Sequence, residues 1–185
     1  KYLNGHSDVV AGVVCGPAGM IREIFRGPYM TFGAIIGPFE AWLMLRGLRT
    51  LGVRMQRVQQ STAQVIEFLQ RHPKIARVYY PGSPGDPQRE LAQRQMKGGS
   101  GILSIEVAAH DLAGVERFCD SLKMFLLAVS WGGHESLAWP VAVAIRGGSA
   151  ESNRTGLPWN LVRLSIGLEE PEDLIADLDQ ALGRV

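Results

Sequence analysis

From residue 75 onward, short apolar runs alternate with segments of helical periodicity. Strands are predicted at 75–80, 101–107, 126–130 and 161–167, and helices at 88–95, 112–122 and in the last segment of the chain. Strands that alternate with helices build a sheet covered by helices. The sequence therefore predicts a domain of the α/β class.

The last helix has the most complete sequence signals. Pro171 suits the first turn of a helix, where its missing N–H costs nothing. The acidic run that starts at Glu169 places negative charge at the positive end of the helix dipole. One apolar stripe consists of Leu174, Ile175, Leu178, Ala181 and Leu182. We expect this helix to pack on the predicted sheet.

The first 71 residues have a different pattern. The β-branched run 9–15 predicts a strand buried on both faces of a sheet, and residues 20–25 predict a short helix. Residues 39–71 are rich in helix formers and predict a long helix, with a break near Gly47 or Gly52.

Composition argues against several functions. Nineteen basic and eighteen acidic residues give a net charge of +1, so no overall field favours nucleic acid or a membrane. No run reaches the roughly 18 apolar residues of a membrane span, and the first residues do not resemble a signal peptide. We therefore expect a cytoplasmic protein with neither partner.

The cysteines and histidines favour neither a metal site nor a disulfide. Cys15 and Cys119 are far apart in sequence and form no CxxC pair, so free, buried thiols are expected. The four histidines share no ligand spacing, and we predict no metal centre.

The first segment that could take part in a reaction is residues 1–8, Lys-Tyr-Leu-Asn-Gly-His-Ser-Asp, which we call the lysine block. Its lysine stands directly before a turn of small residues. A lysine amine bonds covalently to carbonyl compounds and carries protons between neighbouring atoms. The alternative is an ordinary surface lysine beside a turn.

Two further segments have features of a ligand site. Residues 129–137, Val-Ser-Trp-Gly-Gly-His-Glu-Ser-Leu, form the serine block, whose glycines let main-chain N–H groups approach an anion. Residues 161–169, the arginine block, place Arg163 in an apolar strand, where its planar donors suit a carboxylate. The alternatives are a strand-to-helix turn without a ligand and an internal ion pair, for example from Arg163 to Glu135.

Together the three blocks resemble the Cys/Met-metabolism PLP-dependent enzymes, which include cystathionine lyases, methionine γ-lyase, cystathionine γ-synthase and homoserine sulfhydrylases. The matching family motifs are Thr-Lys-Tyr-x-Asn-Gly-His-Ser-Asp, Ser-Leu/Trp-Gly-Gly-x-Glu-Ser-Leu and Arg-Leu-Ser-x-Gly-x-Glu. The resemblance implies that Lys1 is the catalytic residue and binds the cofactor pyridoxal 5'-phosphate as a Schiff base. It also implies that Ser130, Trp131 and Arg163 bind the substrate, Arg163 through the α-carboxylate.

The resemblance further implies the C-terminal part of a fold-type I, aspartate aminotransferase-like enzyme. Residues 1–45 would be the tail of the large PLP-binding domain, and residues 46–185 a small C-terminal α/β domain. Family members are longer and carry most of their cofactor contacts upstream of the lysine. We therefore expect the upstream half of the same protein and a homotetramer, a dimer of dimers, as partners. The 185 residues alone would be inactive.

A fourth motif lies in residues 46–51, which are similar to the family's Arg-Gly-Leu-Lys/Arg-Thr-Leu signature. We interpret the arginines here mainly as contacts between helix, domain and subunit. Nucleic-acid binding by Arg46, Arg49, Arg54 and Arg57 is the alternative, but no aromatic residues are interleaved with them.

Two details bear on the reaction. Trp131 and the run 173–179 look most like bacterial cystathionine β-lyase, which implies a carbon–sulfur lyase that cleaves a sulfur amino acid by β-elimination. Cystathionine γ-lyases usually carry glutamate where Val129 stands. The alternatives are cystathionine γ-lyase, γ-synthase, homoserine sulfhydrylase, or a catalytically silent oligomerisation domain.

Overall fold

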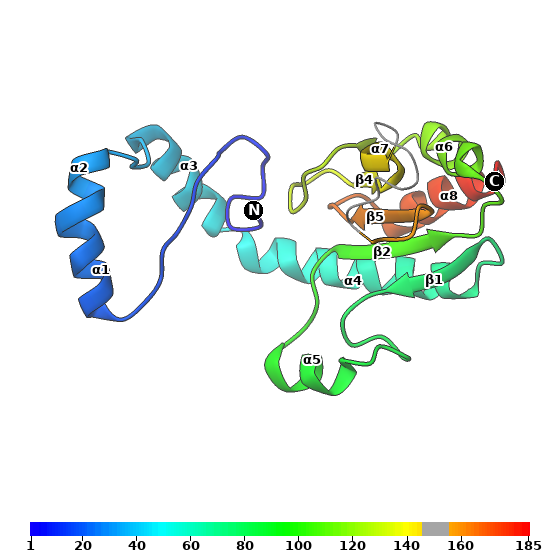
Figure 1. Cartoon of the computed structure of the whole chain (residues 1–185), viewed down its shortest axis with the longest axis horizontal. Coiled ribbons are helices and arrows are strands. Elements are labelled where there is room, and N and C mark those ends of the chain that lie inside the picture. The colour runs from blue at the N-terminus through cyan, green and yellow to red at the C-terminus, as the bar shows by residue number, and fades with distance from the viewer. Residues whose placement is uncertain (146–155) are drawn as a thin grey trace.

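The computed structural model describes residues 1–145 and 156–185, and it shows an N-terminal arm followed by a sheet packed on helices (Figure 1). The arm, residues 9–48, contains α1 (Ala18–Ile24), η1 (Phe25–Tyr29), α2 (Met30–Phe32) and α3 (Pro38–Leu48). The long helix α4 (Leu51–Arg71) joins the arm to the sheet. The short helix predicted at 20–25 is confirmed as α1.

A mixed sheet occupies the centre of the second part. Its strands are β1 (Ile75–Tyr79), β2 (Ile102–Val107), β3 (Leu126–Leu127), β4 (Leu137–Pro140) and β5 (Leu161–Ser165). They lie in the order β1-β2-β5-β4-β3, and all neighbours are antiparallel except β3 and β4. The last strand in sequence, β5, is therefore the central strand in space.

One face of the sheet is apolar because its strands alternate. In β2, Leu103 and Ile105 are buried, whereas the alternate residues 102, 104 and 106 are half-buried. Leu164 and Val162 of β5 pair with these two residues and continue the same face. Such alternation is typical of antiparallel strands that cover a core on one side.

Three helices cover this apolar face: α4, α6 (Leu112–Ser121) and α8 (Pro171–Leu182). α4 packs against β1 and α8, and α6 packs against α8 and β4. Asp111 caps α6 by accepting a hydrogen bond from the N–H of Gly114 at 2.8 Å. Two short helices, α5 (Arg89–Gln95) and α7 (Ala142–Ile145), complete the described elements. The predicted α/β class is confirmed, and no described helix is long and apolar enough to cross a membrane.

The predicted start and apolar stripe of the last helix are confirmed. Pro171 lies in the first turn of α8, together with Glu172 and Asp173. Leu174 and Leu178 are fully buried in the core beneath the sheet. The helix therefore packs as its sequence pattern predicts.

The long helix predicted at 39–71 is broken, as expected. α3 ends at Leu48 and α4 begins at Leu51, and the hydroxyl of Thr50 donates to the carbonyl of Gly47 at 3.2 Å. That a domain boundary accompanies this break, near residue 45, stays a prediction.

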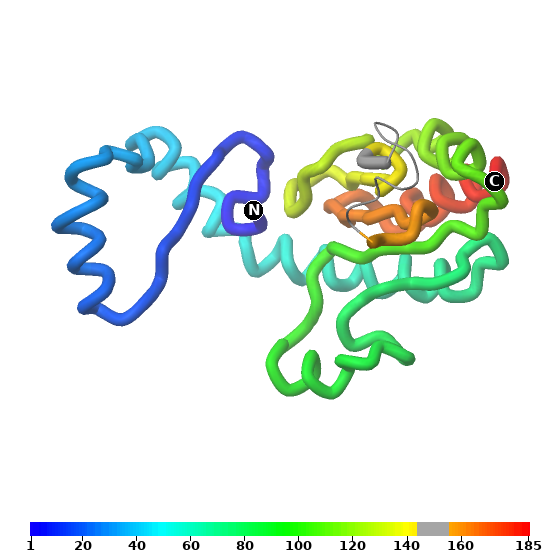
Figure 2. Tube along the Cα trace, in the orientation of Figure 1, coloured from blue at the N-terminus to red at the C-terminus, as the bar shows by residue number. Residues whose placement is uncertain are grey.

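The prediction of a buried strand at 9–15 is wrong. These residues have no regular secondary structure, Val10 and Val14 are exposed, and the blue trace leads away from the sheet toward α1 (Figure 2). A β-branched run needs neighbouring strands, and none in the described part of the chain pairs with it. Cys15 is exposed with this segment, so only Cys119 is the expected buried thiol. Burial raises the pKa of Cys119 to about 12.

A second correction concerns residues 126–130. Only Leu126–Leu127 forms a strand, and both residues are exposed. The carbonyls of Val129 and Ser130 accept hydrogen bonds from Arg163 instead of continuing the ladder. The sequence patterns also missed β4 and α7, which follow the serine block.

A buried carboxylate fixes the turn that leads into β3. Asp177 of α8 is 5% exposed and accepts hydrogen bonds from three consecutive main-chain N–H groups. The donors are Lys123 at 2.9 and 3.1 Å, Met124 at 2.8 Å and Phe125 at 3.3 Å. Hydrogen bonds to a charged acceptor are stronger than those between neutral groups, so Asp177 ties this turn to α8.

We expect Asp177→Ala to lower the free energy of unfolding by about 3 kcal/mol, because buried N–H groups lose a charged acceptor. Asp177→Asn keeps the volume and one oxygen, so its loss should be smaller. Denaturant unfolding followed by circular dichroism measures both. Asp179→Ala, an exposed position on the same helix, is the matched control. Equal stabilities of the Asp177→Ala and Asp179→Ala variants would contradict this role.

Candidate active site

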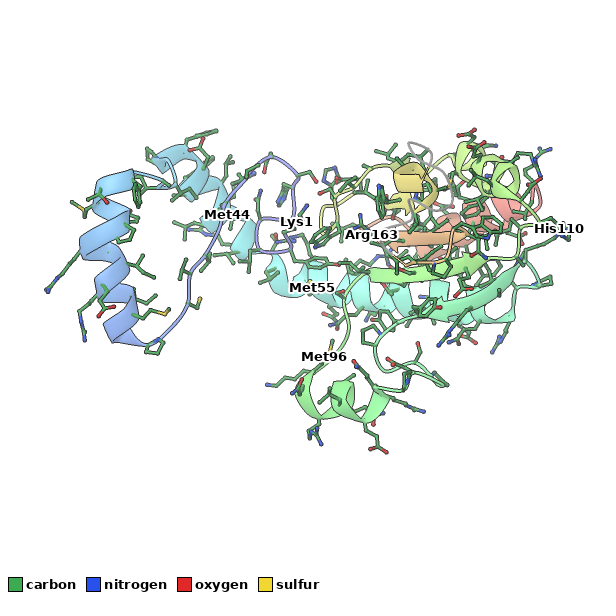
Figure 3. The ribbon with its side chains drawn as sticks, viewed as in Figure 1. Lys1, Met44, Met55, Met96, His110 and Arg163 are labelled. Carbon is green, nitrogen blue, oxygen red and sulfur yellow. The ribbon has the colours of Figure 1, made fainter. Side chains whose placement is uncertain are left out.

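Lys1 lies at the junction between the arm and the sheet, on the side of the arm that faces Arg163 (Figure 3). Its Nζ donates a hydrogen bond to the Oγ of Ser130 at 3.1 Å. Nζ also lies 4.1 Å from the centroid of the Trp131 ring. The turn is closed behind it by the N–H of Gly5, which donates to the carbonyl of Lys1 at 3.0 Å. The structure thus brings the lysine block and the serine block together.

Gly132 makes this close approach possible. Its φ is +78°, and a Cβ there would lie 3.1 Å from the nitrogen of Tyr2 and 3.2 Å from the Cβ of Lys1. A residue with a side chain is strained at this φ and would crowd the lysine. The glycine predicted to allow a sharp turn therefore also lets the loop pass against Lys1.

Arg163 lies on the face of the sheet opposite the core, paired with Ser104 of β2 and Trp139 of β4. Its Nη2 donates to the carbonyls of Val129 and Ser130. Its guanidinium carbon lies 5.3 Å from the Trp131 ring centroid and 5.5 Å from that of Trp139. Burial lowers the pKa of Arg163 from its ordinary value, but arginine remains charged in proteins.

Part of the Arg163 guanidinium is left without a partner. Nε is buried and has no hydrogen-bond partner. Within residues 1–145 and 156–185 no ion pair joins Arg163 to Glu135. The internal ion pair considered from the sequence is therefore not formed. A half-buried guanidinium whose Nε has no partner is suited to an anion from outside the chain.

The positive charges of Lys1 and Arg163 both lie against the ring of Trp131. Like charges that share one contact repel each other, and an aromatic face offsets part of this cost. A bound carboxylate or phosphate would lower it further. This part of the surface therefore favours an anionic ligand.

The serine and arginine blocks are joined by a second carboxylate. Glu169 accepts hydrogen bonds from the N–H of Ser136 at 2.7 Å and from its hydroxyl at 2.8 Å. The N–H of Gly132 donates to the Oγ of Ser165 at 3.3 Å. Glu169, which the sequence placed in the acidic run before α8, therefore also has a contact that its position in that run did not suggest. Its carboxylate holds two loops together.

A further contact joins the lysine block to the serine block. The hydroxyl of Ser7 donates to Glu135 at 2.6 Å, and His134 lies 3.1 Å from the same carboxylate. Burial opposes ionisation of Glu135, but these hydrogen bonds and the charge of His134 outweigh it and lower the pKa of Glu135 below 4.5. Ser7 adopts a φ of 58°, which is uncommon for a residue other than glycine.

A cavity of about 630 Å³ opens beside these contacts. It is lined by Lys1, Ser130, Trp131 and Glu135, together with apolar residues of the arm such as Met44. Arg163 is not in its lining and reaches this region through Trp131. A separate hollow of about 760 Å³ between β1 and the loop 81–87 contains none of the predicted site residues. In the described part of the chain, no cluster of His, Cys, Asp and Glu side chains could hold a metal ion.

Residues 1–183 match the family model of the Cys/Met metabolism PLP-dependent enzymes. The chain belongs to this family. It is 43% identical over 184 residues to cystathionine gamma-lyase of Sus scrofa, covering 98% of this chain and 45% of that protein. It is 40% identical over 185 residues to cystathionine beta-lyase of Coxiella burnetii, covering 98% of this chain and 48% of that protein.

A solved structure confirms the fold. Cystathionine gamma synthase of Xanthomonas oryzae pv. oryzae, determined in complex with aminoacrylate and cysteine, is 40% identical and superposes with a TM-score of 0.89. The match covers 100% of this chain and 48% of that one. The fold expected from the resemblance, part of a fold-type I PLP enzyme, is therefore confirmed. The chain spans about half the length of the relatives it matches.

The residues present fit the family's cofactor, pyridoxal 5'-phosphate. Lys1 offers a primary amine that lines a cavity, and its described contacts are a hydroxyl and an aromatic ring. Within the described residues, no carboxylate forms an ion pair with Lys1. An amine in this setting is available to an aldehyde. Lys1 would hold the cofactor, and Ser130 and Trp131 would lie beside the bond.

Several residues of this region were missed from the sequence. Ser7, Glu135, Ser136 and Glu169 all fall within the three blocks, but their pairing depends on which strands are neighbours. Arg54 could have been recognised from the sequence, because it occupies the buried stripe of α4 four residues before Val58. An arginine at a core position requires polar partners.

The pH dependence of the link between Ser7 and Glu135 is testable. Because the folded pKa of Glu135 is lowered, its carboxylate stabilises the fold above its ordinary value of 4.5, and this contribution is lost as the pH falls through the folded value. We expect the melting temperature of Glu135→Gln to depend less on pH below 4.5 than that of the wild type. Glu23→Gln, at an exposed site on α1, is the control. A wild-type slope in Glu135→Gln would disprove the link.

Proposed function

We propose that this chain provides the lysine and the carboxylate-binding side of a PLP-dependent carbon–sulfur lyase. Its substrate would be a sulfur amino acid, and its reaction the β-elimination of cystathionine. The observation that supports this most directly is the 3.1 Å contact from the Nζ of Lys1 to Ser130, against the ring of Trp131. A positioned amine beside a hydroxyl and a cavity is the arrangement that proton transfer needs.

Lys1 would act first as the attachment point of the cofactor and then as the proton carrier. When bound, pyridoxal phosphate withdraws electrons from the substrate's α-carbon and so makes its proton acidic. The Nζ of Lys1 would take the proton from that carbon and pass it to the sulfur as the bond between the β-carbon and sulfur breaks, so that homocysteine leaves as a thiol. Ser130 accepts a hydrogen bond from Nζ and thereby keeps the amine directed toward its loop. Trp131 covers one side of the amine.

Arg163 would hold the substrate by its α-carboxylate. Its contacts to the carbonyls of Val129 and Ser130 fix the guanidinium, while Nε has no partner. Binding the carboxylate next to Lys1 places the α-carbon within reach of the amine. Since Arg163 and Lys1 share the ring of Trp131, the two roles belong to one site.

The choice of β-elimination rests on positions 129 and 131. The side chain of Val129 is 63% exposed and carries no charge for the distal ammonium of cystathionine, where γ-lyases usually carry glutamate. Relatives named γ-lyase, γ-synthase and β-lyase are 43%, 42% and 40% identical, so overall identity does not separate them. Cystathionine γ-lyase, γ-synthase and homoserine sulfhydrylase are the alternative functions within the family.

The partners of the site are also part of this proposal. The arm exposes large apolar side chains, among them Phe32 at 83% and Phe39 at 64%. Large apolar side chains that are exposed together on one segment are typical of an interface. We propose that this apolar surface of the arm is covered by further copies of the chain, in a homotetramer, and by a segment equivalent to the additional part of the longer relatives. A catalytically silent oligomerisation domain would use the same surface without the chemistry at Lys1.

The decisive experiment is product analysis of full-length protein with L-cystathionine. We expect homocysteine, pyruvate and ammonia, together with a visible cofactor band that borohydride reduction traces to Lys1. Lys1→Ala should lose both the covalent band and the activity, because the amine is removed. Cysteine with 2-oxobutanoate would identify γ-cleavage instead. A colourless wild-type protein without either product would support the silent domain.

Substitution of Arg163 tests the carboxylate contact. Arg163→Ala should raise KM for cystathionine by about 100-fold, since a desolvated charge contact is lost, and leave the cofactor band in place. Arg163→Lys should be intermediate because lysine lacks the planar donors. Arg77→Ala, at an exposed arginine of β1, is the control. Loss of cofactor with unchanged kinetics after reconstitution would contradict this role.

A further inference from the structure

Arg54 is a buried arginine that contacts the lysine block. It lies in the first turn of α4 and is 8% exposed. Its Nη1 donates to the carbonyl of Tyr2 at 2.9 Å, and its Nη2 donates to the carbonyl of Leu3 at 3.4 Å. These carbonyls belong to the residues directly after Lys1. The guanidinium therefore holds the main chain at the base of the lysine side chain.

The same guanidinium fixes the junction between α3 and α4. Nη2 also donates to the carbonyl of Gly47 at 2.9 Å, and Nε donates to the Oγ1 of Thr50 at 3.1 Å. The last turn of α3, the start of α4 and the lysine block are thereby joined through one side chain. A single movement of Arg54 would release all three.

The acceptors of Arg54 are neutral. Within the described residues, Arg54 forms no ion pair, and burial lowers its pKa from the ordinary value. Burying a cation without an anion is unfavourable, so packing alone does not explain an arginine here. A planar group with several donors in fixed directions is suited to hold several carbonyls at once.

The lysine block also touches the junction directly. A Cβ on Gly47 would collide with the main chain of Asn4, so no side chain separates α3 from the block. On the other side, the hydroxyl of Tyr2 accepts a hydrogen bond from the N–H of Gly101, just before β2, at 2.9 Å. The block is therefore held between the helix junction and the sheet.

We infer that Arg54 is a positioning residue for Lys1, which sets the direction of the amine toward Ser130 by holding the carbonyls of Tyr2 and Leu3. The catalytic meaning of this inference rests on the proposed function. A misplacement of about 1 Å typically costs about 100-fold in rate. Arg54 would thus control the rate of proton transfer without touching substrate or cofactor.

The test uses the full-length protein with pyridoxal phosphate bound. Arg54→Met removes every donor and keeps a long apolar side chain. Arg54→Lys keeps the charge but not the planar set of donors. Arg71→Met is the matched control, since Arg71 is an exposed arginine at the far end of the same helix. Three measurements are compared: the amide exchange of residues 1–8, the visible cofactor band, and the steady-state kinetics with cystathionine, which give kcat and KM.

We expect amide exchange in residues 1–8 to rise at least about tenfold in Arg54→Met, and kcat to fall about 100-fold with KM changed less than about twofold. Arg54→Lys should lie between Arg54→Met and the wild type, and Arg71→Met should match the wild type. If Arg54→Met fails to fold, the inference requires Arg54→Lys to show faster amide exchange and a lower kcat, both by smaller factors.

Unchanged exchange in folded Arg54 variants would overturn the inference, and so would faster exchange with a normal kcat. A wild-type protein that neither binds the cofactor nor cleaves cystathionine would instead refute the proposed function. The exchange measurement needs no cofactor and would then still decide whether Arg54 holds the lysine block.

Discussion

The pairing of β5 with β2 on one side and β4 on the other is the constraint on which the site depends. Successive residues of a strand point to opposite faces, so a shift of one residue would turn Arg163 into the core and Leu164 out of it. The buried partners Leu103 and Ile105 make such a shift costly. The apolar packing under the sheet therefore fixes the face from which the guanidinium meets the loop of Ser130.

In the described part of the chain, two buried charges, Asp177 and Arg54, and the half-buried Glu169 hold main-chain groups. Asp177 holds three N–H groups before β3, Glu169 holds Ser136, and Arg54 holds the carbonyls after Lys1. Each of these charges fixes a loop that has no regular hydrogen-bond ladder of its own. The lysine and serine blocks are loops of this kind, so charged side chains do for them what strand pairing does for the sheet.

Much of this arrangement was predictable from the sequence, and the failures have a common cause. α8 and β2 were predicted because their apolar periodicity is local, and the contact of Lys1 with Ser130 agrees with the resemblance of their blocks. The strand expected at 9–15 was wrong because burial on both faces depends on neighbours that the run itself cannot specify. The role of Glu169 was missed for the same reason, since an acidic residue before a helix has a local explanation that hides its contact to Ser136.

The contact of Arg163 with the loop has an evolutionary consequence. The guanidinium binds the carbonyl of Val129, which every amino acid offers, while the side chain of Val129 points out and is 63% exposed. Replacement at this position can add or remove a charge without disturbing the anchor beneath it. Under the proposed function, a change of charge at position 129 would therefore alter substrate preference on an unchanged scaffold.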